Sequence, residues 1–125
     1  MKPAAAVVPD TLTLGEVFDQ LPKRPLERVF IVKGDELVSW INPRDVLEKM
    51  HHSELDARLP VTAVAKPVEF ALAPDMPLTT ALEAFLREQT TILPVTPGQW
   101  RNTLLGEVSR SDVMLAIQDR LTYPK

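Results

Sequence analysis

The sequence predicts an α/β (α+β) fold of two repeats, each a small sheet with two helices, related by a pseudo-two-fold axis. A strand that leads into an acidic helix start occurs twice, with Asp45 and Asp112 at matching places 67 positions apart. That spacing is far longer than a solenoid repeat, which indicates two half-domains that fold together. Strand and helix patterns also follow the same order in both halves. A chain of 125 residues with 45% apolar content suits one compact domain of this kind.

The first repeat reads as helix, hairpin, helix. Thr13 and Glu16 form a capping-box pattern in front of a helical stripe made by Leu14, Val17, Phe18 and Leu21. Residues 29–32 and 37–41 have strand character on either side of a turn, which predicts a β-hairpin. Asn42 then caps a second helix that has Pro43 in its first turn and an apolar stripe of Val46, Leu47 and Met50.

The second repeat follows the same order. Residues 68–72 alternate as a half-buried strand, and a helix starts at residues 75–77. One wide face of this helix is apolar and consists of Leu78, Ala81, Leu82, Phe85 and Leu86. Residues 91–95 and 103–108 are predicted strands around a loop. The closing helix has an apolar stripe of Val113, Ile117 and Leu121.

These patterns place the first repeat at residues 1–52, a linker at 53–67 with one helical turn near 61–64, and the second repeat at 68–125. Only residues 5–8 are available as the opening strand of the first repeat, so we expect that strand to be truncated.

Composition excludes several classes of function. The formal charge of −3 gives no long-range attraction to nucleic acid or anionic lipid, and the absence of cysteine removes disulfides and thiol catalysis. No apolar run approaches the ~20 residues of a membrane span, which predicts a soluble polypeptide. His51 and His52 are adjacent and point apart on a helix, so we expect no metal site. No nucleophile and base pattern appears, and we expect no catalytic residues.

The strongest candidate site is the junction from Ser109 to Asp112. A carboxylate at a helix start can accept both hydroxyls of a ribose, while free backbone N–H groups, Ser109 and Arg110 suit phosphate oxygens. This combination selects a nucleotide over bare phosphate. The same pattern is also an ordinary capping box, in which the two side chains satisfy the helix itself and bind nothing. A weaker second site is predicted at Asn42, Arg44 and Asp45.

The second junction resembles the closing half of a CBS (cystathionine-β-synthase-type) domain, whose signature is Gly-x-apolar-Ser/Thr-x-x-Asp. Gly106, Ser109 and Asp112 match it, whereas the first copy has Ser39 and Asn42 before its Asp45. The two copies together resemble a tandem CBS pair, or Bateman module. This resemblance implies a regulatory domain that binds AMP, ADP or ATP, with the adenine beside Val68, Phe70 and Pro94.

Within that family, residues 63–68, 91–95 and 105–112 are most similar to the cytoplasmic C-terminal region of CLC-type chloride channels and transporters. This resemblance implies a cytoplasmic location and an attached membrane transport domain. The apolar helix faces, together with the family resemblance, imply a homodimer. Two alternatives stay open: a structural dimerisation module without a ligand, and a CBS regulator of another transporter or of an enzyme.

Overall fold

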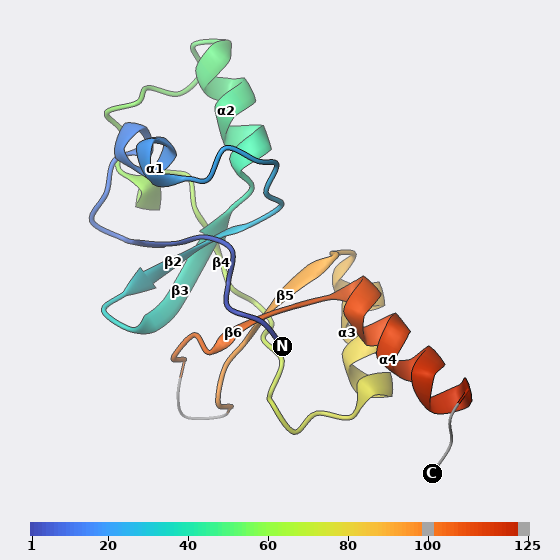
Figure 1. Cartoon of the computed structure of the whole chain (residues 1–125). Helices are drawn as coiled ribbons and strands as arrows, with labels where there is room; N and C mark the ends of the chain where they lie inside the picture. The colour runs from blue at the N-terminus through green and yellow to red at the C-terminus, as the bar shows by residue number, and fades with distance from the viewer. Residues whose placement is uncertain (99–101, 123–125) are drawn as a thin grey trace. The chain divides into compact units, whose positions relative to one another are not determined.

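The computed structural model of the chain describes residues 1–98 and 102–122 (Figure 1). It divides into two compact units, one formed by Ala4–Glu69 and one formed by Met1–Pro3 together with Phe70–Lys125. Each unit has its own sheet, its own pair of helices and its own apolar core. The predicted α/β (α+β) class is therefore confirmed.

The unit Ala4–Glu69, called the first unit below, is built on a four-stranded sheet with the order β1-β2-β3-β4. Its strands are β1 (Val7–Pro9), β2 (Val29–Lys33), β3 (Glu36–Ile41) and β4 (Lys66–Pro67). Strand β1 runs parallel to β2, and the other neighbours are antiparallel. Strands β2 and β3 form the predicted hairpin, and Gly34 takes a φ of 65° in its turn, which suits a residue without Cβ.

Two helices and one 3₁₀ turn complete the first unit. Helix α1 (Leu14–Gln20) begins with a full capping box, and helix α2 (Pro43–His51) is capped by Asn42, as predicted. The helical turn expected near residues 61–64 is the 3₁₀ turn η1 (Val61–Ala63). The core of the unit consists of Ala6, Val8, Leu14, Val17, Val29, Ile31, Ile41, Val46 and Val61.

The segment between the helix α2 and strand β4 packs on this core. Val61 is fully buried, Leu55 and Leu59 are half-buried against the core, and β4 pairs with β3. In helix α2, Leu47 is exposed, so the predicted stripe buries only Val46 fully. The repeat boundaries at 52 and 68 stay a prediction.

The second unit contains helix α3 (Leu78–Glu88), the antiparallel strands β5 (Ile92–Val95) and β6 (Gly106–Ser109), and helix α4 (Arg110–Thr122). Its core combines residues of both helices, of strand β5 and of the segment before α3: Leu72, Ala81, Ala84, Phe85, Leu93, Val95 and Val113. Residues 99–101 of the predicted loop lie outside the described residues.

The strand predicted at residues 68–72 is wrong. Lys66 and Pro67 pair with β3, Val68 N donates to Val38 O at 3.5 Å, and Leu72 forms only an isolated parallel bridge to Val95. The backbone groups of this stretch are thus divided between two sheets. Only Glu69 is exposed in this stretch, which is a connecting segment and not a continuous strand.

The start of the chain belongs to the second unit, which the sequence did not indicate. Lys2 N donates to Glu107 O at 3.1 Å, and Glu107 N donates to Lys2 O at 2.8 Å. The adjacent Gly106 is buried, and a Cβ added there would overlap the backbone oxygen of Lys2. The missing side chain of this glycine therefore makes room for the N-terminal segment.

Gly106→Ala is expected to destabilise the chain by ~1–3 kcal/mol, because the new methyl group must displace Lys2 or distort β6. Urea unfolding measures the loss. The matched control is the same substitution in a chain that begins at Ala4, where the obstructing carbonyl is gone and the loss should nearly vanish. An equal loss in both backgrounds would show that Lys2 is not the cause.

Asp56 and Arg58 form a local ion pair with 2.9 Å between Arg58 Nη2 and Asp56 Oδ2, and Arg58 N donates to Asp56 Oδ1 at 2.8 Å. The side-chain hydrogen bond from Arg58, followed by the backbone one, lowers the pKa of Asp56 to about 2. Arg58→Ala should raise this pKa toward the usual aspartate range, and an NMR titration of the Asp56 carboxyl measures it. The Asp56 carboxylate takes up a proton, and the ion pair is lost, only as the pH falls through the pKa of Asp56 in the folded chain. An unchanged titration in the variant would contradict this origin of the shift.

Candidate functional site

The junction between β6 and α4 brings together the three residues expected to bind the sugar and phosphate. Asp112 N donates to Ser109 Oγ at 3.1 Å, so the serine caps the helix. Arg110 N donates to Thr91 O at 2.8 Å, which fixes the junction to the residue before β5. The Oγ atoms of Ser109 and Ser111 lie 3.3 Å apart. The backbone at this junction is therefore held in place before any ligand binds.

The Asp112 carboxylate does not complete a capping box. In helix α1, Glu16 N donates to Thr13 Oγ1 at 3.3 Å and Thr13 N donates back to Glu16 Oε1 at 3.1 Å. In α4 only the first of these two bonds forms, and Asp112 is exposed. Across the described residues, no hydrogen bond or ion pair engages the Asp112 carboxylate. Its two oxygens are open to a donor from outside the chain.

The junction between β3 and α2 has the same design. Asn42 Oδ1 accepts hydrogen bonds from Arg44 N at 3.1 Å and from Asp45 N at 3.4 Å. The Asp45 carboxylate is likewise exposed and without a partner among residues 1–98 and 102–122. Asn42 thus does for α2 what Ser109 does for α4, and each helix start presents one open carboxylate.

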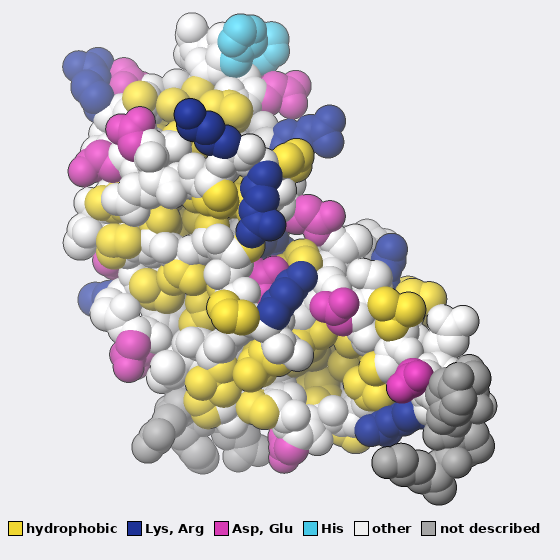
Figure 2. Space-filling model, viewed as in Figure 1, with side chains coloured by type: hydrophobic (Ala, Val, Ile, Leu, Met, Phe, Trp, Pro, Cys, Tyr) yellow, Lys and Arg dark blue, Asp and Glu magenta, His cyan; other side chains and the backbone are white. Residues whose placement is uncertain are grey.

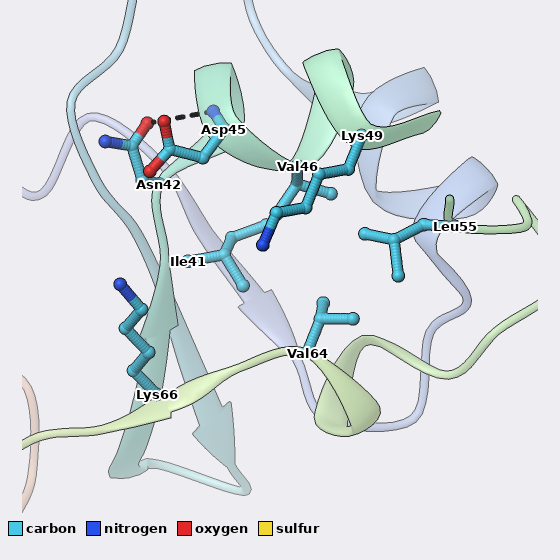
Figure 3. Close-up of a pocket in the computed structure, with 8 residues that line it drawn as sticks. All are labelled: Ile41, Asn42, Asp45, Val46, Lys49, Leu55, Val64 and Lys66. Carbon is cyan, nitrogen blue, oxygen red and sulfur yellow. Dashed lines mark hydrogen bonds between the residues drawn. The ribbon is translucent and has the colours of Figure 1, made fainter. Parts of the chain in front are cut away.

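A pocket of about 190 Å³ opens beside Asp45 in the first unit (Figure 3). Apolar side chains form part of its wall, and its polar groups are an amide, a carboxylate and two ammonium groups. The lining residues are Ile41, Asn42, Asp45, Val46, Lys49, Leu55, Val64 and Lys66. Arg44, which was predicted with Asn42 and Asp45, is exposed and does not line this pocket.

Sequence reasoning missed the two lysines. Lys49 follows Asp45 by four positions on α2, so helical spacing could have indicated that the two share a face. Lys66 reaches the pocket only because β4 pairs with β3, and nothing local in the sequence predicts that register.

The three residues expected beside the adenine lie in different settings. Val68 belongs to the first unit and is half-buried, whereas Phe70 and Pro94 belong to the second. The Phe70 ring carries the Arg87 guanidinium 4.9 Å from its centroid. Pro94 is fully buried in β5, and its carbonyl accepts a hydrogen bond from Leu72 N at 2.9 Å.

Comparison with known proteins gives the following matches. A sequence model described as "CBS domain" matches residues 57–119. No curated protein matches the chain. None of the helices in the described part is long and apolar enough to cross a membrane.

Three solved structures have the same fold. The cystathionine beta-synthase pair domain of a putative Mg²⁺ transporter from Shewanella oneidensis MR-1 is 18% identical, with a TM-score of 0.73 over 94% of this chain and 66% of that one. A CBS domain protein from Pyrobaculum aerophilum complexed with AMP is 20% identical, with a TM-score of 0.74 over 95% of both chains. A CBS domain protein from Streptococcus pneumoniae TIGR4 is 22% identical, with a TM-score of 0.72 over 94% of this chain and 81% of that one. The chain thus spans about two thirds of the Shewanella chain.

Proposed function

The chain belongs to the CBS domain family, and from this premise we propose that it is a regulatory module that binds an adenine nucleotide (AMP, ADP or ATP) and biases the state of an attached protein. It acts by binding and not by catalysis. The observation that carries the proposal is the open Asp112 carboxylate at the start of a helix whose cap is already made by Ser109. A carboxylate that accepted a hydrogen bond within a capping box would not be open to a ligand in this way.

The junction between β6 and α4 has hydrogen-bonding groups for the sugar and for the phosphate of a nucleotide. The two ribose hydroxyls donate to Asp112, and the phosphate takes hydrogen bonds from the Ser109 hydroxyl and the Arg110 guanidinium. The family resemblance supports a base beside Phe70, which is half-buried and belongs to the same unit as Asp112. The Pyrobaculum relative, complexed with AMP, supports adenosine as the shared part of the ligand. Asn42, Arg44 and Asp45 form the second, weaker site.

Isothermal titration of the purified chain with AMP, ADP, ATP and GTP tests the proposal. Binding of at least one adenine nucleotide at micromolar concentration, with GTP weaker, is expected. A thermal melt gives an independent reading, because a ligand at a hundred times its dissociation constant adds ~2.7 kcal/mol to stability. No response to any of the four nucleotides would favour the structural alternative.

That alternative, a dimerisation module without a ligand, has one observation in its favour. Ser109 and Asn42 both serve as helix caps, so each junction has a structural role even when nothing is bound. In that alternative the two open carboxylates act only through their favourable interaction with the positive end of each helix dipole.

The attached protein in this proposal is a membrane transport domain, with the module on its cytoplasmic side. The likeness of residues 63–68, 91–95 and 105–112 to chloride channels and transporters supports a chloride carrier. The Shewanella relative, from a putative Mg²⁺ transporter, supports a transport role more broadly. The module also forms a homodimer through helices α3 and α4, which have exposed apolar side chains.

A further inference from the structure

Two lysines stand at the rim of the Asp45 pocket, on different elements. Lys49 comes from α2, one helical turn after Asp45, and Lys66 comes from β4 (Figure 3). Within the described part of the chain, neither ammonium group takes part in an ion pair, and Lys49 and Asp45 do not pair with each other. Lys66 Nζ lies 5.3 Å from the centroid of the Trp40 ring. Both charges are therefore available to a ligand.

The rest of the pocket wall is apolar, and the pocket is small. Ile41 and Val46 are buried and Leu55 and Val64 are half-buried, so this part of the pocket has no group that could solvate a charge. Its volume of about 190 Å³ is below the ~300–1,000 Å³ of pockets that enclose whole drug-sized ligands. One ring or sugar fits inside, and the charged part of a nucleotide must then lie at the rim.

The two units differ in which residues carry positive charge near the open carboxylate. Lys66 is paired with Trp40 across the sheet of the first unit, and Lys2 is paired with Glu107 in the second. Glu107 is the counterpart of Trp40, because the two are 67 positions apart, as Asp45 and Asp112 are. Each unit therefore has a lysine bridged to the strand that leads into its junction. Helix α2 adds Lys49, whereas that offset places Ala116 at the matching position of α4. The second unit has Arg110 at the start of α4 instead, so the Asp45 pocket differs in having a lysine one turn further along its helix.

We propose that Lys49 and Lys66 make the Asp45 pocket a site that selects nucleotides by their number of phosphates and favours triphosphates over monophosphates. This inference rests on the proposed function. The rim contains two positive charges and the negative charge of Asp45. A ribose held by Asp45 brings its first phosphate close to that carboxylate, where repulsion weakens binding. Each further phosphate extends toward the lysines, and charge-assisted hydrogen bonds then raise the affinity.

The test isolates this pocket in a chain carrying Asp112→Asn, titrated with adenosine, AMP and ATP at low salt without divalent cations. Affinity should rise from AMP to ATP by about 10-fold or more, and raising the salt should reduce the increase. Lys49→Ala and Lys66→Gln in the same background should each remove most of the increase and leave adenosine binding within about 2-fold. Lys33→Gln is the charge-matched control, since Lys33 is exposed at the opposite end of the hairpin from this pocket.

The outcomes separate the two claims. If the wild-type chain binds none of the three compounds, the proposed function fails. If the wild-type chain binds but the Asp112→Asn chain shows no preference for ATP, or if the lysine variants retain that preference while folded by circular dichroism, the phosphate selection is overturned. A gain in ATP preference on Ala116→Lys in an Asp45→Asn chain supports the helix lysine as the deciding charge.

Discussion

Asp112→Ala is expected to weaken AMP binding by at least ~10-fold while the chain keeps its fold. The two ribose hydroxyls lose a charged acceptor, and hydrogen bonds to charged groups contribute ~1.5–3 kcal/mol each. The fold should tolerate the change because the cap of α4 is the Ser109 hydroxyl, which accepts from the backbone of residue 112 and not from its side chain. The loss in stability should stay within the ~0.3–1 kcal/mol of an acidic residue at a helix start. Isothermal titration and a thermal melt of both chains measure the two effects.

Glu16→Ala supplies the matched control. Glu16 stands three residues after its cap, as Asp112 does, but its carboxylate accepts a hydrogen bond from Thr13 N. Its removal should lower stability by ~0.5–2 kcal/mol and leave AMP binding unchanged. Equal AMP affinity of wild type and Asp112→Ala would remove Asp112 from the site, and a loss of binding in Glu16→Ala would indicate a general effect of destabilisation.

The junctions were predictable because their signals are local. A cap acts within three or four residues, so the placement of Asn42 before α2 and Ser109 before α4 follows from the sequence. The hairpin of β2 and β3 follows for the same reason, since its turn is four residues long. The fold class can then be predicted from the order of these elements along the chain.

The long-range pairings were not predictable. Lys2 pairs with Glu107 across more than a hundred residues, and neither residue type has a preference that would indicate it. This pairing also accounts for Gly106, whose missing side chain gives room to the backbone of Lys2. The strand predicted at 68–72 was wrong for a related reason, because an alternation of apolar and polar residues does not indicate which strand is the hydrogen-bond partner.

The proposed homodimer requires apolar side chains on α3 and α4 that remain exposed within the second unit itself. The sequence assigned Phe85 to the same face as Leu86, but Phe85 is fully buried in the core of the second unit. Four other side chains on these helices are 53–78% exposed, and these are Leu86, Met114, Leu115 and Leu121. Figure 2 shows hydrophobic side chains on the visible surface of this region. Leu115 lies about 200° around α4 from the buried Val113, so its own core cannot cover it.

Leu115→Glu is therefore expected to convert the dimer to a folded monomer, whereas Phe85→Glu should unfold the chain. A charge placed at the centre of an interface costs at least ~2 kcal/mol, which weakens association about 30-fold or more. A charge in place of a fully buried phenylalanine loses ~3–5 kcal/mol of packing in addition to the cost of burying the carboxylate. Light scattering at tens of micromolar should give twice 14.0 kDa for the wild type and 14.0 kDa for Leu115→Glu, with circular dichroism as the check on folding. A wild-type mass of 14.0 kDa with and without AMP would refute association through these helices, and an unfolded Leu115→Glu would place Leu115 in the core.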